Sequence, residues 1–310
     1  MSHKPVLLSE VIEHLAINAN GIYVDGTFGR GGHSKEILKR LNDKGFLLAL
    51  DKDEEAIKAA HTEKLDKNPH FYIQHGSFTK LQTYAAAKGL LGKIDGILLD
   101  LGVSSPQLDE AERGFSFTQD GPLDMRMDRN QTLSAKEWVN TAKMQEIAEV
   151  LRKYGEERYA KRIANYIVAE RSLSIIETTG RLAAIVSQAN PRWETNKHPA
   201  TRTFQAIRIF INHELEALEQ VLPQSLNLLK AGGRLLVISF HSLEDKIVKD
   251  FANLHSSFAH LPRGLPLTQK ELEIHIRLKK INGAIRASQD EIINNPRARS
   301  AILRVMEKIK

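Results

Sequence analysis

The 310-residue sequence contains no cysteine. Disulfide bonds and zinc sites with thiolate ligands are therefore excluded, because both require cysteine sulfur. Catalysis through a cysteine thiolate, which forms a covalent intermediate with its substrate, is excluded for the same reason. The absence of cysteine also agrees with a reducing compartment such as the cytoplasm.

Long apolar runs are missing as well. No run approaches the ~18 residues of a transmembrane helix, and residues 1–10, MSHKPVLLSE, lack the apolar stretch of a signal peptide. We therefore expect a cytoplasmic protein that does not associate with membranes. The length of 310 residues and the hydrophobic content of 42% predict one large domain or two modest ones.

Residues 22–34, IYVDGTFGRGGHS, form the most informative segment. An apolar run ends in Asp25, a loop with four glycines follows, and a helical pattern begins. A second apolar run ends in Asp51, twenty residues beyond Gly31. This order predicts a nucleoside-binding βαβ unit, because the glycines let the backbone approach a ligand closely and Asp51 can accept hydrogen bonds from two ribose hydroxyls.

Three kinds of ligand are bound by such units. A P-loop needs a lysine after its second glycine, but Gly32 and His33 follow Gly31. A dinucleotide fingerprint needs a third glycine where Ser34 stands. S-adenosylmethionine has no phosphate and needs only close backbone approach and a helix N-terminus facing its carboxylate. The segment favours S-adenosylmethionine, and a dinucleotide site or a plain structural turn stays open.

A methyltransferase without cysteine is restricted in its acceptor atoms. Methylation of carbon 5 of a pyrimidine generally requires a thiolate that first adds to the ring. We therefore expect transfer to nitrogen or oxygen, whose lone pair attacks the sulfonium methyl group directly.

The formal net charge of +6 is unevenly distributed along the chain. Residues 151–210 and residues 261–310 each contain eleven Lys and Arg against five Asp and Glu, and the remainder is net acidic by six. Two basic regions on an acidic body predict binding to a polyanion, in the first place nucleic acid. Basic helices that are merely solvated are the alternative.

Apolar runs alternate with helical patterns in the first hundred residues, which predicts a parallel sheet with crossover helices. The expected strands are residues 22–25, 46–51, 71–75, 94–101 and 234–240. The last crossover is more than 130 residues long, whereas a βαβ connection normally needs about 30. We therefore predict an α/β, Rossmann-like core formed by residues 1–112 and 203–310, with an inserted, mostly helical domain formed by residues 113–202.

Helical periodicity recurs within and after this insert. Apolar residues follow helical spacing over residues 147–154 and 182–189. The apolar residues between 204 and 222 predict one long helix that leads back to the main sheet.

Residues 102–132 show little periodicity, which is typical of a lid or binding loop beyond the carboxyl end of a strand. Four aspartates in this loop could suggest a metal site, but three interleaved arginines favour a salt-bridged loop. We therefore assign no metal. The aspartates are Asp109, Asp120, Asp124 and Asp128, and the arginines are Arg113, Arg126 and Arg129.

A series of long motifs follows in the order of one known family. They lie at residues 3–8, 25–34, 99–107, 113–117, 120–128, 154–157, 198–206, 239–245 and 295–300. Over essentially its whole length the chain thereby resembles the bacterial ribosomal RNA small subunit methyltransferase H family, also called MraW. The resemblance implies an S-adenosylmethionine-dependent enzyme that methylates N4 of one cytidine in the decoding region of 16S ribosomal RNA. It also implies a class I methyltransferase core with an inserted helical domain.

The resemblance assigns cofactor-binding roles to individual positions. The cofactor loop is expected at the methionine end, the acid after the second strand at the ribose, and an aromatic residue after the third strand near the adenine. Two further positions match the remaining contacts. In that order the residues are Gly31, Gly32 and His33, then Asp51, then Phe78, then Asp100 and Gln107.

The exocyclic amine of cytosine is a poor nucleophile, because its lone pair is delocalised into the ring. A catalyst should accept a hydrogen bond from this amine and hold the nitrogen in line with the methyl group, without a covalent intermediate. Many amino-methyltransferases carry Asp/Asn-Pro-Pro-Tyr/Phe after the fourth strand for this purpose, but residues 100–107 read DLGVSSPQ. Asp100 is our candidate for this hydrogen-bond acceptor. The alternative is that its carboxylate is wholly occupied by contacts with the cofactor.

The target base must leave its stack to reach the methyl group. Residues on loops expected near the pocket, namely Phe115, Phe117, Phe240 and His241, could stack on it. The candidates for phosphate contacts are Arg152, Lys161, Arg162, Lys197 and Arg202. The expected partner is 16S ribosomal RNA in the small ribosomal subunit, and a homodimer is left open.

Two other functions stay open. A ribose 2′-O-methyltransferase also needs no cysteine, but it usually relies on a lysine-centred tetrad, and no lysine follows the fourth strand. A non-catalytic RNA-binding factor in ribosome assembly could keep S-adenosylmethionine as a structural ligand, and a turnover assay would distinguish it from an enzyme.

Overall fold

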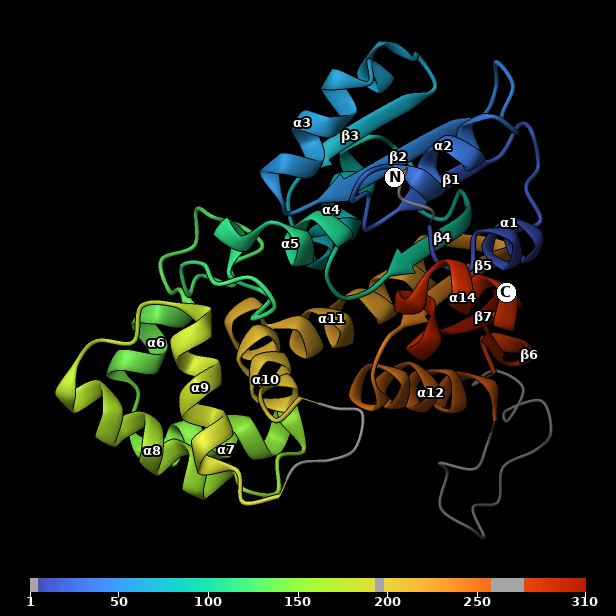
Figure 1. Ribbon diagram of the computed structural model, residues 1–310. Coiled ribbons are helices and arrows are strands. Elements are labelled where there is room, and N and C mark those ends of the chain that lie inside the picture. Colours follow the sequence, from blue (N-terminus) through green and yellow to red (C-terminus); the bar gives the residue numbers. More distant parts are fainter. Residues whose placement is uncertain (1–4, 193–197, 258–275) are drawn as a thin grey trace, which may run out of the picture. The chain divides into compact units, whose positions relative to one another are not determined.

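A computed structural model describes residues 5–192, 198–257 and 276–310 (Figure 1). The chain forms two compact units. The core unit comprises Met1–Gly102 and Leu215–Lys310, and the helical unit comprises Val103–Glu214. The domain boundaries expected from the sequence, after residues 112 and 202, lie inside the helical unit.

The core unit contains a seven-stranded sheet with the order β3-β2-β1-β4-β5-β7-β6. The first five strands in this order are parallel, and β7 is antiparallel to both of its neighbours. The order β3-β2-β1-β4-β5 is that of the doubly wound Rossmann fold, so the predicted fold class is confirmed. The strands are β1 (Ile22–Asp25), β2 (Phe46–Asp51), β3 (Phe71–His75), β4 (Ile94–Asp100), β5 (Leu229–Ser239), β6 (Leu278–Arg286) and β7 (Ile302–Lys308).

The strand β2 shows why the sheet is buried on both faces. Its residues Leu47 to Leu50 form a continuous apolar run, as expected for a parallel strand covered on both sides. Leu47 and Ala49 pack into one core cluster, which includes residues of α1 (Leu8–Leu15), α2 (Gly32–Leu38) and α3 (Glu54–Thr62). Leu48 and Leu50 pack into the other cluster with residues of α4 (Leu81–Ala87), α11 (Glu214–Leu228) and α12 (Ser242–Ser256).

The sequence analysis did not predict β6 and β7. The strand β6 alternates poorly, and most of its residues are at least partly exposed, because it lies at the edge of the sheet. Between them lie α14 (Gln289–Asn294) and the 3-10 helix η4 (Pro296–Ser300). The strand β7 is the last strand in the chain, and it lies between β5 and β6 in the sheet (Figure 1).

The helical unit is built from α-helices, as predicted. The predicted apolar stripes at residues 147–154 and 182–189 are buried, which confirms that they are core positions. The unit contains α5 (Ser105–Asp109), the 3-10 helix η3 (Ala111–Arg113), α6 (Ala135–Thr141), α7 (Met144–Gly155), α8 (Ala160–Leu173), α9 (Thr179–Ala189) and α10 (Ala200–Asn212).

The prediction of one long helix through residues 204–222 is wrong. The helix α10 ends at Asn212, and His213 adopts a left-handed conformation with φ of 51°. The His213 backbone N–H donates to the carbonyl oxygens of Ile209 and Phe210, which closes the last turn. An ion pair at 2.8 Å between Arg208 and Glu214 spans the break.

The long loop after β4 is salt-bridged, as the interleaved charges predicted. Arg126 donates from Nε and Nη2 to the two carboxylate oxygens of Asp124, at 2.8 Å each. Arg113 is buried and donates to the carbonyl oxygens of Arg126 and Met127.

Among the described residues, no helix has the length and apolar character needed to cross a membrane.

Candidate functional site

The loop between β1 and α2 is fixed across the ends of two neighbouring strands. The backbone N–H of Gly26 donates to the carbonyl oxygen of Leu98 in β4, and that of Phe28 donates to Leu50 in β2, each at 2.9 Å. Asp25, at the end of β1, is buried and accepts hydrogen bonds from the Ser34 hydroxyl at 2.6 Å and the Thr27 backbone N–H at 3.1 Å. The loop is therefore held in one conformation by its own chain.

Two glycines of this loop are required by packing. Gly31 has φ of 71°, and a Cβ there would lie 2.5 Å from the ring of Phe28. A Cβ on Gly32 would lie 2.2 Å from Cγ of Pro5. Both positions thus leave no room for a side chain, because Phe28 and Pro5 pack directly against the backbone there.

Asp51, at the end of β2, is oriented by two backbone donors. Its Oδ2 accepts from Gly29 N at 2.7 Å, and its Oδ1 accepts from Asp53 N at 2.8 Å. Burial of the carboxyl group raises the pKa of Asp51 to about 6, against these hydrogen bonds. Each carboxylate oxygen has a second lone pair, so Asp51 keeps acceptor capacity for two ligand hydroxyls.

Asp100, at the end of β4, carries an unsatisfied buried oxygen. Its backbone N–H donates to the Thr27 hydroxyl at 2.7 Å. Its Oδ1 is buried and has no hydrogen-bond partner within the described part of the chain. Burial, and then the carboxylates of Asp25 and Glu244, raise the pKa of Asp100 well above its usual range. An orphaned buried acceptor in a native fold is typical of a ligand-binding or catalytic position.

His33, in the first turn of α2, faces Asp100. Its Nδ1 lies 3.7 Å from Asp100 Oδ2, and its Nε2 lies 3.0 Å from the carbonyl oxygen of Val6. A carbonyl can only accept, so Nε2 carries the hydrogen. Nδ1 is then the ring nitrogen beside the Asp100 carboxyl group.

The other two expected cofactor residues lie in different units. Phe78 begins the 3-10 helix η2 (Phe78–Lys80) and packs partly against the core; its Cβ would lie 3.8 Å from a Cβ on Gly26. Gln107 lies in α5 of the helical unit, where its side chain accepts a hydrogen bond from Ser104 N at 2.9 Å. Gln107 thereby completes a capping box at the start of α5.

Two carboxylates of this site, those of Asp25 and Glu244, were not predicted from the sequence. Asp25 was used only as the end of a strand, although it directly precedes the glycine-rich loop. Glu244 is buried in α12, where its Oε2 accepts from Phe240 N at 2.8 Å. Its position in the motif at residues 239–245 was the available signal, but only the folded chain brings its charge near Asp100.

The aromatic candidates for base stacking lie in packed surroundings. Phe240 packs partly against the core, and His241 caps α12 by accepting a hydrogen bond from Glu244 N at 3.4 Å. Phe115 is 5% exposed, with the Arg113 guanidinium 5.8 Å from its ring centroid. Phe117 is partly exposed, and its ring lies 4.6 Å from that of His198.

The basic candidates for phosphate contacts lie on helices of the helical unit. Arg152 on α7 and both Lys161 and Arg162 on α8 are exposed. Arg202 on α10 is partly buried and donates from Nη1 to the Glu156 carbonyl oxygen at 2.9 Å. Lys197 lies outside the described residues.

The three strand-end carboxylates match the charge of S-adenosylmethionine. Asp51, Asp25 and Asp100 end the neighbouring strands β2, β1 and β4, and the strand order reverses between β1 and β4. Ligands of open α/β sheets bind at this switch point. The sulfonium and ammonium groups of S-adenosylmethionine are attracted by carboxylates, whereas the pyrophosphate of a dinucleotide is repelled. The described residues contain no group of three His, Asp or Glu arranged to hold a metal ion.

Comparisons with known proteins give one consistent family. The model of the MraW methylase family matches residues 1–309. The Ribosomal RNA small subunit methyltransferase H of Coxiella burnetii (strain RSA 331 / Henzerling II) is 55% identical over 308 residues, which are 99% of this chain and 99% of that protein. The protein of the same name from strain Dugway 5J108-111 is 54% identical over the same shares.

Solved structures were compared as well. An rRNA methylase from Streptococcus thermophilus matches 100% of this chain and 99% of its own, with 14% identity and a TM-score of 0.41. Nothing in these comparisons supports the homodimer that the sequence left open. On the family match and the identity to its relatives, the chain belongs to the MraW methylase family.

Proposed function

We propose that the protein transfers a methyl group from S-adenosylmethionine to N4 of a cytidine in the decoding region of 16S ribosomal RNA. Two of its relatives are named as small subunit ribosomal RNA methyltransferases. The observation that carries the chemistry is the buried, unpartnered Oδ1 of Asp100 at the end of β4. The absence of cysteine supports a nitrogen acceptor, because no thiolate is available to activate a ring carbon.

The core unit would hold the cofactor at the strand ends. Asp51, kept in place by Gly29 N and Asp53 N, would accept the ribose hydroxyls. Phe78 would pack near the adenine, and the loop through Gly31, Gly32 and His33 would lie at the methionine end. Asp100 and Gln107 would supply the remaining contacts. When bound, S-adenosylmethionine would supply an electrophilic methyl carbon: the amine nitrogen would bond to it while the C–S bond breaks and S-adenosylhomocysteine leaves, without a covalent enzyme intermediate.

Asp100 would act on the amine. The positive sulfonium of bound S-adenosylmethionine would favour the ionised form of Asp100 despite its raised pKa. Oδ1 would then accept a hydrogen bond from the exocyclic NH₂, which holds the nitrogen in line for attack and directs its lone pair out of the ring. After transfer the nitrogen carries one proton too many, and Asp100 can take that proton. His33, with Nδ1 at 3.7 Å from Oδ2, would then be placed to accept this proton from Asp100.

The helical unit would recognise the RNA. Its basic residues, Arg152, Lys161, Arg162, Lys197 and Arg202 in the sequence, would contact phosphates. The target cytidine must leave its stack, and Phe117, which is partly exposed, is the best placed of the predicted stacking residues in that unit. Phe115, Phe240 and His241 would stack on the base only after moving from their packed positions.

A labelling experiment tests the proposed function. Unmodified small ribosomal subunits are incubated with the purified protein and methyl-labelled S-adenosylmethionine, and the RNA is digested to nucleosides. The label should appear in N4-methylcytidine alone. Label on ribose would favour a 2′-O-methyltransferase, and label on carbon 5 would overturn the inference from the missing cysteine. Cofactor binding without label in any RNA would favour a non-catalytic assembly factor.

A further inference from the structure

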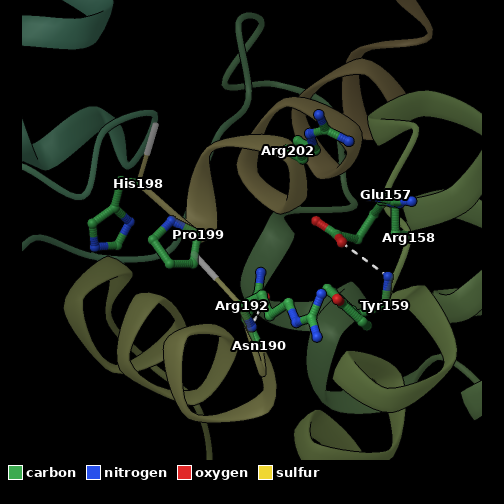
Figure 2. Close-up of a pocket in the computed structure, with 8 residues that line it drawn as sticks. All are labelled: Glu157, Arg158, Tyr159, Asn190, Arg192, His198, Pro199 and Arg202. Atoms are coloured by element: carbon green, nitrogen blue, oxygen red, sulfur yellow. Dashed lines mark hydrogen bonds between the residues drawn. The ribbon is translucent and has the colours of Figure 1, made fainter. Parts of the chain in front are cut away.

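A pocket in the helical unit is separate from every residue assigned to the cofactor (Figure 2). It lies where the turn between α7 and α8, the end of α9 and the start of α10 meet. Its lining residues are Glu157, Arg158, Tyr159, Asn190, Arg192, His198, Pro199 and Arg202. Of these, only Arg202 was given a role of its own from the sequence, although Glu157, His198 and Pro199 lie in two of the motifs.

The pocket is strongly basic. Among the lining residues that the structure describes, three are arginines and Glu157 is the single acid. The Glu157 side chain is only 5% exposed and accepts a hydrogen bond from Tyr159 N at 3.0 Å, as the dashed line in Figure 2 shows. Arg158 and Arg192 are exposed. The positive charge therefore faces solvent, while the one negative charge is turned into the fold.

The walls of the pocket are held rigidly. Arg202 Nη1 donates to the Glu156 carbonyl oxygen at 2.9 Å, which ties α10 to the turn before α8. A Cβ on Gly155 would lie 2.6 Å from the Arg202 carbonyl oxygen, so the end of α7 packs directly on α10. Ala200 N, at the start of α10, donates to His198 Nδ1 at 3.2 Å. Little ordering of the backbone is then needed when a ligand binds.

The start of α8 already has a carboxylate of the chain beside it. The 14-residue helix α8 begins directly after Tyr159, whose backbone N–H donates to Glu157. Glu157 offsets the partial positive charge of this helix N-terminus, so the positive charge of the pocket comes from its arginines. The end of α9 at Asn190 contributes the opposite partial charge, but the full charge of Arg192 two residues later outweighs it.

We propose that this pocket binds a backbone phosphate of the RNA substrate. The inference rests on the proposed function and extends it by naming a substrate subsite. The forked guanidinium group matches phosphate oxygens bidentately, which a lysine does not. A polyanion suits the site better than a small anion, because Arg152, Lys161 and Arg162, which lie within five residues of the lining segment 157–159 in the sequence, are exposed as well.

The test compares two double variants with equal loss of charge. Arg158→Gln/Arg192→Gln removes the exposed arginines of the pocket. Lys136→Gln/Lys143→Gln is the control: Lys143 precedes the opposite end of the 12-residue helix α7, roughly 18 Å from the pocket at 1.5 Å per residue. Binding to unmodified small subunits is measured by filter retention at several salt concentrations, with S-adenosylhomocysteine present to prevent turnover.

The pocket variant should bind small subunits roughly tenfold more weakly at moderate salt, and the slope of log K against log salt should fall by about 1. The control should keep the wild-type affinity to within about threefold. The charge-conserving variant Arg158→Lys/Arg192→Lys should recover the salt slope, and failure to recover it in a folded protein would contradict a phosphate contact.

Two further outcomes would overturn the inference. If the pocket variant binds and methylates small subunits as the control does, the pocket does not contact RNA, and the proposed function stands without it. The second outcome concerns cytidine monophosphate or inorganic phosphate. If either binds saturably to the wild type but not to the pocket variant, and both proteins bind RNA equally well, the site serves a free phosphate compound. If the wild type neither binds nor methylates small subunits, the proposed function itself fails.

Discussion

Nδ1 of His33 lies 3.7 Å from Oδ2 of Asp100, while Nε2 of the same ring lies 3.0 Å from the carbonyl oxygen of Val6. The contact with Val6 fixes which ring nitrogen faces the carboxylate. Because Oδ1 of Asp100 has no partner in the described part of the chain, the two carboxylate oxygens differ. One faces a titratable ring, and the other is left for a ligand donor.

Replacing Asp100 should separate stability from activity. Its raised pKa means that ionisation costs stability in the cofactor-free protein, and this cost grows as pH rises through the pKa of the folded state. Asp100→Asn should therefore raise the free energy of unfolding by about 0.5–2 kcal/mol at alkaline pH, and less at acidic pH. Methyl transfer should fall by at least about 100-fold.

Urea unfolding at two pH values and a single-turnover assay check this prediction. Asp95→Asn is a matched control, because Asp95 lies in the same strand but at its other end, where it pairs with Lys230. An Asp100→Asn protein that is less stable at alkaline pH than the wild type would contradict the assigned cost of ionisation.

Replacing His33 should change turnover more than binding. His33→Asn keeps a polar group near Val6 but removes the titratable Nδ1 that faces Asp100. The rate of methyl transfer should fall roughly 100-fold. Cofactor affinity, measured by calorimetry, should change by less than about 1 kcal/mol.

The same measurements on His61→Asn, an exposed histidine on α3, provide the comparison. Unchanged turnover in a folded His33→Asn protein would show that His33 does not act through Asp100.

Replacing Asp51 should weaken the binding of the cofactor. Asp51→Ala should reduce S-adenosylmethionine affinity by ~1–3 kcal/mol, as for a charged hydrogen-bond acceptor. Titration calorimetry measures the effect, with Asp43→Ala as a control because Asp43 is fully exposed. Equal affinities of the folded Asp51→Ala variant and the wild type would remove Asp51 from the site.

Cofactor binding should also depend on pH through Asp51. Its pKa of about 6 places it in the ionised form above this pH and the protonated form below it. A protonated carboxyl group has lost acceptor capacity, so S-adenosylmethionine affinity should fall as pH is lowered from about 8 to about 5. Bound cofactor should favour the ionised form, and binding near pH 6 should release protons. Calorimetry in buffers of different ionisation enthalpy would detect this release, and its absence would contradict the assignment.

The basic pair on α8 should matter for RNA alone. Lys161→Gln/Arg162→Gln should weaken binding to small subunits and flatten its salt dependence, because both residues are exposed. Cofactor affinity should stay the same. The control is Lys39→Gln/Arg40→Gln, which removes two consecutive exposed basic residues of the core unit. It should leave RNA binding near the wild-type value. Lost cofactor affinity with intact RNA binding would reverse the proposed division between the units.

The sequence by itself determined the parallel half of the fold. The strands β1, β2 and β4 were predictable because each contains a short run of buried, mostly apolar residues, such as Leu47 to Leu50 in β2. The glycine-rich loop and Asp51 followed from the same pattern. The length of the fourth crossover indicated an inserted unit, because no single connection needs so many residues.

Only the tertiary structure decided the rest. The edge strand β6 has no clear alternation, so its pairing with β7 could not be read from the chain. The break at His213 depends on its left-handed backbone and on an ion pair across the turn. Asp25, Asp100 and Glu244 are far apart in the sequence, and the perturbed pKa of Asp100 arises only when burial and their mutual repulsion act together. Composition and periodicity report local preference, whereas burial and charge proximity are properties of the packed chain.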